Sequence, residues 1–270
     1  TDHTEPLGID KNMPARFLLP LIDQKAASGF VNASLALDQA RAVKDIQEQE
    51  LMRKASHLND TAMAEITHFF KEGVTETDLA EQLKKIYRAL GADGLSFEPL
   101  FAFGSNAASG HHWPDDTRLK PGDCILVDIG CTWEGYCSDM TRTFFYKNVT
   151  QHQQEVYHTV LKANEEAEKA VTPGIPLSSL DQIARGIITD KGYGSAFTHR
   201  LGHFIGLEDH EFGDVSSASA DRAVPGNIFS IEPGVYLEND MGVRVEDLVL
   251  VTDHGHEILN HFSKELTVID

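Results

Sequence analysis

Cysteine is scarce in this sequence, with three among 270 residues. An odd number cannot form a complete set of disulfides, and the spacing contains no CxxC pair of the kind found in redox and zinc sites. All three lie in or near apolar stretches, where a free thiol packs as a small hydrophobic side chain. We therefore interpret Cys124, Cys131 and Cys137 as buried thiols of a protein from a reducing compartment.

Basic residues are also few. Lysine and arginine number 23 against 42 aspartates and glutamates, which leaves a net charge of −19. Binding to nucleic acid or to an anionic membrane surface requires a basic patch, so neither is an expected partner. No apolar run approaches the ~18–20 residues of a membrane span. With no signal peptide in the sequence, we expect a cytoplasmic protein.

The most informative feature is the presence of acids inside apolar, strand-like runs. Asp128 and Glu232 each lie seven residues after the proline of a Pro-Gly turn, at Pro121 and Pro225. A second strand-like run with another acid follows each of them, and the four acids are Asp128, Asp139, Glu232 and Glu246. An ionised carboxylate in an apolar sheet costs several kcal/mol unless it is paired or bound to a metal. Four of them in a repeated pattern indicate a bound cation.

The acids belong to an internal duplication. Helical periodicity runs from about residue 36 to Gly91 and again from about residue 150 to Gly192. Gly73 and Gly91 are 18 residues apart, as are Gly174 and Gly192. Each half thus has a helix pair, a Pro-Gly turn and two acid-bearing strands. Such duplication predicts two similar units about a pseudo-twofold axis, with the acids converging at the seam.

Histidines supply further donors. His199, His203 and His210 lie within twelve residues that also contain Gly202 and Gly206, and His111 lies in a Gly- and Pro-flanked loop. Four carboxylates and an imidazole form an oxygen-rich donor set that suits Mn²⁺, Co²⁺, Zn²⁺ or Fe²⁺. A structural zinc site would instead favour thiolate ligands. The charge of the four carboxylates matches two divalent ions, and ions ~3.5–4 Å apart can act together on a substrate carbonyl. The residues predict metal-assisted hydrolysis, with histidines as proton carriers and oxyanion stabilisers.

Five ordered motifs carry a resemblance to a known family. They are Asp128-Ile-Gly, Ser138-Asp139-x-Thr-Arg-Thr, His199-x-x-Gly-His203-x-x-Gly-Leu-x-x-His210, Glu232-Pro-Gly-x-Tyr and Arg244-x-Glu246-Asp. Over residues 36–265 the chain resembles the pita-bread metallopeptidases, and most of all Xaa-Pro dipeptidase (prolidase) and aminopeptidase P. The resemblance implies an α+β pita-bread (creatinase/aminopeptidase) fold, with two pseudo-twofold-related halves of a helix pair and strands around a curved antiparallel sheet.

The resemblance also implies a role for each metal ligand. Asp139 and Glu246 would bridge two divalent ions, Asp128 would complete one ion, and His203 and Glu232 the other. Glu232 would in addition move a proton from the bridging water to the leaving nitrogen. Manganese is the first expectation for the ions, with cobalt or zinc as alternatives.

Four further residues match positions around the family's metal site. His111, His199 and His210 would hold the substrate carbonyl and carboxylate. Arg244 would steady the site through a bridging carboxylate. The implied reaction is hydrolysis of the bond before proline in an Xaa-Pro peptide.

Alternative functions differ in substrate and in chemistry. The first expectation is a dipeptidase (prolidase), the second an aminopeptidase P that acts on longer Xaa-Pro peptides, and the third a non-catalytic peptide-binding pita-bread protein. Methionine aminopeptidases carry a different motif around the second aspartate. Creatinase-type hydrolases and non-catalytic relatives lack the ligand set, whereas all five ligands occur here.

Domain organisation departs from the family pattern. Prolidases and aminopeptidases P carry a large N-terminal domain that helps to form the dimer and to select substrate length. We expect residues 1–34, which are punctuated by proline, to be the remnant of such a domain and its linker, and residues 35–270 to be the catalytic domain. The full-length protein is then expected to be a homodimer.

Overall fold

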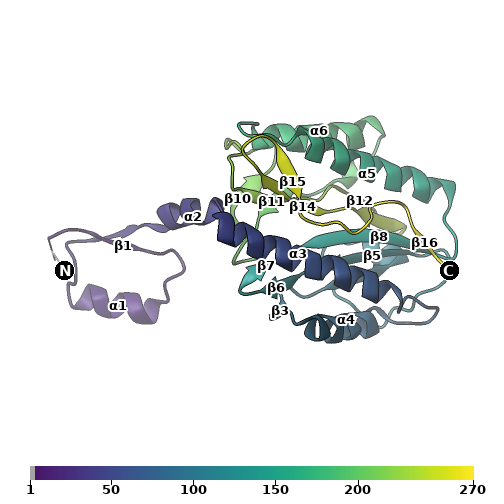
Figure 1. Ribbon diagram of the computed structural model, residues 1–270, viewed down its shortest axis with the longest axis horizontal. Coiled ribbons are helices and arrows are strands. Elements are labelled where there is room, and N and C mark those ends of the chain that lie inside the picture. The colour runs from purple at the N-terminus through teal and green to yellow at the C-terminus, as the bar shows by residue number, and fades with distance from the viewer. Residues whose placement is uncertain (1–3) are drawn as a thin grey trace.

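The computed structural model describes residues 4–270 and has helices on the outside of the molecule with strands between them (Figure 1). The helices are α1 (Ala15–Asp23), α2 (Ser34–Ala42), α3 (Ile46–Thr67), α4 (Glu76–Leu90), α5 (Gln151–Ala170) and α6 (Leu177–Asp190). Two short 3₁₀ turns are η1 (Gly104–Ala108) and η2 (Gly194–Ala196).

Two sheets form the centre of the molecule. One has the order β16-β8-β5-β4, formed by β4 (Leu100–Phe103), β5 (Cys124–Ile129), β8 (Met140–Tyr146) and β16 (Val268–Ile269). The other has the order β10-β9-β11-β14-β15, formed by β9 (Gly202–Phe204), β10 (Glu211–Val215), β11 (Ile228–Ile231), β14 (Asp247–Val251) and β15 (His256–Ile258). All their neighbouring strands are antiparallel except β16 and β8.

Smaller ladders complete the sheet structure. They are the three strands β3 (Gly94–Leu95), β6 (Cys131–Trp133) and β7 (Tyr136–Cys137), and the hairpin of β12 (Gly234–Leu237) and β13 (Met241–Arg244).

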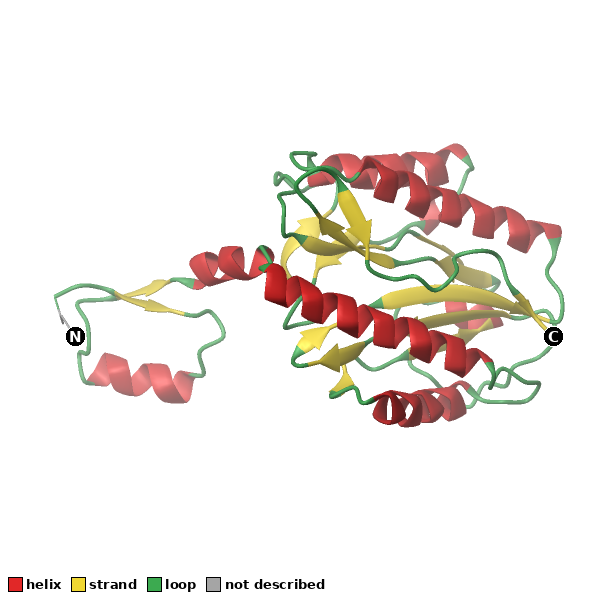
Figure 2. Cartoon of the chain, in the orientation of Figure 1, coloured by secondary structure: helices red, strands yellow, loops and turns green. Residues whose placement is uncertain are grey.

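The duplication predicted from the sequence is present in the fold. The pair α3 and α4 precedes β4, β5 and β8, and the pair α5 and α6 precedes β9, β11 and β14. The long helices lie on the outside, with the strands between them (Figure 2). Gly91 and Gly192, which follow α4 and α6, have φ angles of 83° and 86°, a left-handed conformation that glycine adopts without strain. The α+β pita-bread fold class is therefore confirmed.

Capping residues determine where the long helices begin. Asp45, Thr75 and Thr150 each accept a hydrogen bond from the third residue of the following helix, and each is part of a reciprocal capping box. The expectation of one helical run from residue 36 was wrong at one point, because α2 ends at Ala42 and Val43 is extended. Asp45 then starts α3 as a separate helix.

Strand alternation directs Asp128 toward the second half of the chain. Along β5, Cys124 and Leu126 pack in the hydrophobic core that includes α5 and α6, whereas Ile125 and Val127 pack in the core that includes α3 and α4. Side chains alternate between the two faces of a strand, so Asp128 shares the face of Cys124 and Leu126. This face meets the other half of the molecule.

The cysteines behave as predicted, since all three are buried free thiols. Burial raises the pKa of Cys124 and Cys137 to about 12 and that of Cys131 to about 11. A thiol with so high a pKa stays protonated at neutral pH and is a poor nucleophile.

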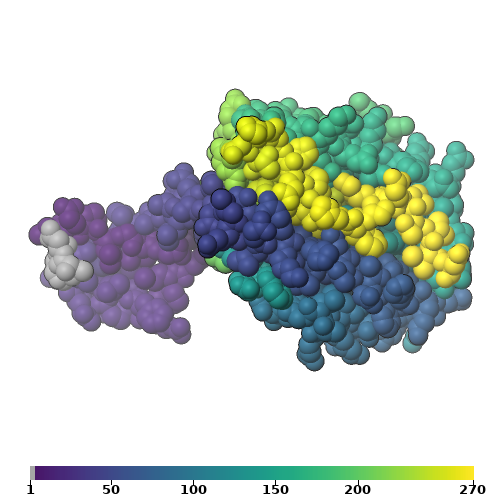
Figure 3. Space-filling model, viewed as in Figure 1, coloured from purple at the N-terminus to yellow at the C-terminus, as the bar shows by residue number. Residues whose placement is uncertain are grey.

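The N-terminal segment projects from the body as an arm (Figures 1 and 3). In it β1 (Leu7–Ile9) pairs in parallel with β2 (Phe30–Asn32), and α1 lies between them in sequence. Every residue from Ala15 to Asp23 is at least partly exposed, and Phe17 and Leu19 are more than half exposed. The proposed division of the chain after residue 34 stays a prediction. Within residues 4–270, none of the helices has the length and apolar character that a membrane crossing requires.

Candidate metal centre

The structure brings the four acids and His203 together where the two halves meet. Each is on, or directly beside, a strand of one of the two central sheets. Asp128 is on β5, Asp139 directly precedes β8, His203 is on β9, Glu232 directly follows β11, and Glu246 lies between β13 and β14. The backbone N–H of Glu246 donates to the carbonyl of Thr141 at 3.1 Å, which connects the two halves at this point.

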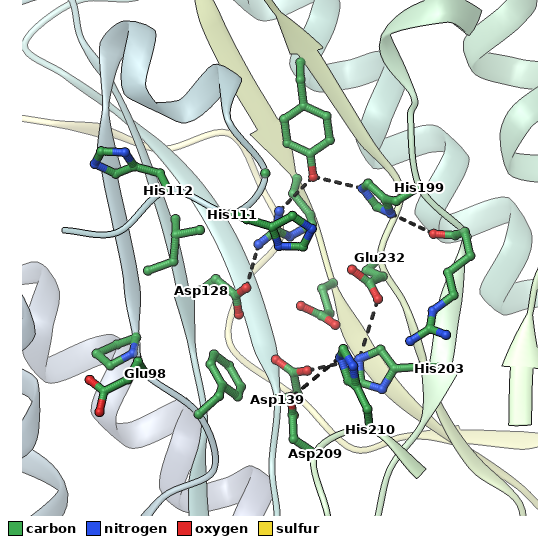
Figure 4. A pocket seen from close by; sticks show the side chains of 18 of the residues that line it. Glu98, His111, His112, Asp128, Asp139, His199, His203, Asp209, His210 and Glu232 are labelled. Atoms are coloured by element: carbon green, nitrogen blue, oxygen red, sulfur yellow. Dashed lines mark hydrogen bonds and ion pairs between the residues drawn. The ribbon is translucent and has the colours of Figure 1, made fainter. Parts of the chain in front are cut away.

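Distances within the cluster suit a shared cation. The Nε2 atom of His203 lies 3.5 Å from Oδ2 of Asp139 and 3.6 Å from Oε1 of Glu232 (Figure 4). Asp139, His203 and Glu246 each offer a ligand atom, and these three atoms lie within 4.8 Å of one another. One ion can therefore reach all three side chains.

The hydrogen-bonding state of the acids tests whether a cation fits. Oδ1 of Asp128, Oδ1 of Asp139 and Oε1 of Glu246 are buried and accept no hydrogen bond from residues 4–270. A buried acceptor without a donor is costly, and native proteins rarely leave one unexplained. Three such oxygens in one cluster fit divalent metal ions, which prefer carboxylate and imidazole donors.

His203 is oriented as a metal ligand. Its Nδ1 lies 3.1 Å from the carbonyl oxygen of Phe204. A carbonyl only accepts, so Nδ1 carries the proton and the lone pair of Nε2 faces Asp139 and Glu232. Burial, with a smaller effect of the nearby His210, lowers the pKa of His203 to about 3. The imidazole is then neutral at pH 7, as metal binding requires.

The acids are crowded enough to retain protons when no cation is bound. Burial, followed by the charges of neighbouring acids, raises the pKa of Asp139 and Glu246 well above their ordinary values. Burial also raises the pKa of Glu232 to about 7. A divalent cation would reverse these shifts and release protons as it binds.

Arg244 links two of the acids. Its Nη2 donates to Oδ2 of Asp128, and its Nε donates to the Thr141 hydroxyl at 3.0 Å. That hydroxyl donates in turn to Oε2 of Glu246 at 2.7 Å. The direct carboxylate partner of Arg244 is therefore Asp128, and Arg244 reaches the expected bridging acid Glu246 through Thr141.

His199 is the end of a hydrogen-bonded chain. Its Nδ1 lies 2.7 Å from the carbonyl oxygen of Arg200, and burial, aided by the charge of Arg244, lowers its pKa to about 4. A neutral ring with a proton on Nδ1 must accept at Nε2, where the hydroxyl of Tyr236 lies at 2.9 Å. Arg244 donates to the same hydroxyl at 2.7 Å. Tyr236 is not among the site residues predicted from the sequence, although the Glu-Pro-Gly-x-Tyr motif contains it.

The other two histidines line a cleft of about 680 Å³ together with the acids. His111 follows η1, and the ring of His210 lies against that of His203, with centroids 3.9 Å apart and the ring planes inclined at 54°. The side chain of His210 is 62% exposed, so it lies at the rim of the site. Asp209, also missed from the sequence, lines the same cleft, and burial followed by the charge of Asp128 raises its pKa to about 7. Its position beside His210 was the only signal.

A second buried charge cluster lies behind Glu246. Asp247 accepts a hydrogen bond from Arg142 at 2.7 Å and lies 2.8 Å from the ammonium of Lys264. Lys264 also donates to Glu168 on α5 at 2.6 Å. Burial and the charge of Asp247, opposed by Lys264, raise the pKa of Glu168 to about 8.

Glu168→Gln is expected to flatten the dependence of stability on pH. The pKa of Glu168 in the folded protein lies above the ordinary 4.5, so its stabilisation is full below that value and is lost as pH rises through 8. Glutamine is neutral at every pH. The free energy of unfolding of the variant, relative to that of the wild type, should therefore rise between about pH 5.5 and about pH 8.5. Urea unfolding across this range measures the difference. Glu165→Gln, an exposed acid on the same helix, is the control; equal slopes for wild type and Glu168→Gln would contradict the prediction.

Comparisons with known proteins agree with this geometry. A model of metallopeptidase family M24 matches residues 50–253. An uncharacterized peptidase of Staphylococcus aureus (strain MW2) is 41% identical over 244 residues, which cover 90% of this chain and 70% of that protein. The structure of the prolidase from Pyrococcus horikoshii OT3 matches with a TM-score of 0.94 at 33% identity, over 97% of this chain and 76% of that one. The X-Pro aminopeptidase from Thermotoga maritima MSB8 matches with a TM-score of 0.93 at 32% identity, over 98% and 76%.

A pita-bread fold whose seam holds buried acids facing an imidazole is the architecture of a metallopeptidase. The family match covers most of the chain, and the identity to relatives is well above chance. The chain belongs to metallopeptidase family M24.

Proposed function

We propose that the protein is a dinuclear metallopeptidase that hydrolyses the Xaa-Pro bond of dipeptides. The observation that carries the proposal is the set of three buried carboxylate oxygens, on Asp128, Asp139 and Glu246, that accept no hydrogen bond from residues 4–270. With Glu232 they bring four negative charges to one cluster, which two divalent ions would neutralise. We propose Mn²⁺ as the ion, with Co²⁺ or Zn²⁺ as alternatives.

Within this proposal Asp139 and Glu246 would hold both ions, Asp128 would hold one of them, and His203 and Glu232 would hold the other. When bound, the ions supply Lewis-acid activation of the peptide carbonyl and of a water. Glu232 would accept one proton of that water as the water oxygen adds to the carbonyl carbon, and would deliver it to the proline nitrogen as the C–N bond breaks.

The remaining residues of the cleft orient the peptide. His111 and His210 line it and can donate to the substrate carbonyl or carboxylate. His199 is positioned by Tyr236, which Arg244 holds in turn. Arg200 also lines the cleft; its Nη1 donates to Asp214 at 2.8 Å, and its other N–H groups can bind the free carboxylate of a dipeptide.

Substrate length separates the proposal from its alternatives. A prolidase and an X-Pro aminopeptidase match this chain with nearly the same TM-score and identity, so the choice of dipeptides is our proposal. The alternatives are an aminopeptidase P that acts on longer Xaa-Pro peptides and a non-catalytic peptide-binding protein. We also propose that residues 35–270 form the catalytic domain and that residues 1–34 belong to a region outside it.

Hydrolysis of Leu-Pro and of Leu-Pro-Leu with added Mn²⁺ tests the function, with Leu-Ala as the control that lacks proline. Faster release of leucine from Leu-Pro than from the tripeptide is the expected result. Faster cleavage of the tripeptide would favour aminopeptidase P. Binding of Leu-Pro without turnover, in protein that contains its metal, would favour the non-catalytic alternative.

A further inference from the structure

A fully buried acid outside the metal cluster holds one loop of the cleft. Glu76 is the first residue of α4, and its carboxylate accepts four hydrogen bonds. Oε1 accepts from the backbone of Phe103 at 2.8 Å and from the side chain of Asn106 at 3.0 Å. Oε2 accepts from Nε2 of His112 at 2.6 Å and from the backbone of Asp115 at 3.1 Å. All four donors lie between residues 103 and 115, the loop that contains His111.

Glu76 is suited to this task by its position. It lies in the first turn of a helix, where the helix dipole favours a carboxylate. Each of its oxygens already accepts two hydrogen bonds, so the group is satisfied by the loop alone. Glu76, His112 and Asp115 have ligand atoms within 4.8 Å of one another, but these hydrogen bonds occupy both oxygens of Glu76 and make the cluster a clamp.

The clamp is connected to the metal centre through two consecutive residues, His112 and His111. His112 is bound to Glu76, and the preceding residue, His111, lines the cleft beside the acids. In Figure 4 His111 lies among the central side chains, while His112 lies toward the edge of the view. Anchoring the ring of His112 thus restricts the backbone from which His111 projects.

The second half of the molecule holds its own histidine loop in a comparable way. The buried carboxylate of Asp181 on α6 binds Arg185 at 2.9 Å and accepts from the backbone of Leu201 at 3.2 Å. Arg185 donates to the carbonyls of Phe197 and His199 at 2.9 and 2.8 Å. In each half, therefore, a buried acid on the second helix holds the segment that carries a cleft histidine.

We propose that Glu76 is a positioning residue that holds the loop of residues 103–115 so that His111 faces the substrate. The proposal rests on the proposed function in that it assigns substrate binding to His111. Glu76 itself touches neither the metal ligands nor the reacting atoms, and it acts through the loop. Replacing Glu76 should therefore lower the rate of hydrolysis only when His111 is present.

A double-mutant cycle between Glu76→Gln and His111→Ala tests this dependence. Glutamine keeps the size of the side chain but sets an N–H₂ group against the N–H donors of the loop. We expect Glu76→Gln alone to lower kcat/KM for Leu-Pro by about 10- to 100-fold, the scale expected when a substrate-positioning group is misplaced. In the His111→Ala background the same change should cost less than about 3-fold, with manganese content unchanged throughout. An equal cost in both backgrounds, or loss of metal, would overturn the proposal.

Hydrogen–deuterium exchange gives a readout that does not depend on turnover. Glu76→Gln should speed exchange in residues 103–115 and leave β5 and β8 unchanged. Asp78→Asn is the matched control, because Asp78 lies in the same helical turn but is exposed and binds Thr75. If Glu76→Gln does not fold, His112→Ala breaks the clamp from the loop side and takes its place. Unchanged exchange in the loop would refute the clamp, whereas faster exchange in a protein without peptidase activity would uphold it and reject only the proposed function.

Discussion

Replacing Glu246 by alanine is expected to abolish peptide hydrolysis while the chain stays folded. Oε2 of Glu246 is held by Thr141, and Oε1 is buried without a hydrogen-bond donor among residues 4–270 beside Asp139 and His203. Removing a proposed bridging ligand should lower kcat by more than about 1,000-fold, since loss of a single oxyanion donor already costs about 10²–10³-fold in other enzymes. The fold should persist because the change removes one of several mutually repelling acids.

Turnover of Leu-Pro, metal content and circular dichroism together measure the effect of this substitution. Glu246→Gln keeps the side-chain volume and separates loss of charge from loss of packing. Glu238→Ala, an exposed acid in the turn between β12 and β13, makes the same chemical change outside the cluster and should leave turnover unchanged. Turnover by Glu246→Ala near the wild-type rate would contradict the bridging role.

Manganese is expected to bind near two ions per chain and to raise the melting temperature of metal-free protein by at least about 8 °C. A ligand at 1,000 times its dissociation constant stabilises the folded state by about 4 kcal/mol per site. For a chain of this size, each kcal/mol shifts the melting temperature by about 2–4 °C. The physical source is the relief of repulsion among acids whose pKa values burial and mutual charge have raised.

Chelator-treated protein titrated with Mn²⁺, followed by calorimetry and metal analysis, gives the stoichiometry and the shift. Asp139→Asn should reduce both, because Asp139 is a proposed bridge. Asp253→Asn, an exposed acid between β14 and β15, should change neither. A protein that stays metal-free in excess Mn²⁺, or that binds without any thermal shift, would contradict the dinuclear proposal.

Much of the candidate metal centre was predictable because its proposed ligands violate a local rule. Asp128 and Glu232 each occur in an apolar run of the sequence, and the energetic cost of such acids is visible without a structure. The duplication then predicted that the acids meet at one seam, and the structure brings them together there. The ends of two helices were also predictable from local sequence, because Gly91 and Gly192 terminate helices through local backbone chemistry.

Other parts of the site could not be read from local pattern. Nothing in the local sequence distinguishes Tyr236 or Glu76. Their roles become visible only through their hydrogen bonds, of Tyr236 to His199 and of Glu76 to the segment that begins at Phe103. The strand-like run that carries Glu246 belongs to two strands in the structure, because β13 ends at Arg244 and β14 begins at Asp247. Glu246 thereby lies between two ladders, where it contacts Thr141 of the other half.

The identity and spacing of the candidate ligands, the repeat and the acidic character of the chain can be read from its sequence, because none of them depends on which distant segments meet in the fold. The hydrogen-bond partners of those residues could not be read from the sequence. Arg244 and Asp128 are 116 positions apart, and Thr141 and Glu246 are 105 apart. Such pairs form only when strand register and helix packing bring distant segments to one seam, so they depend on the folded chain as a whole.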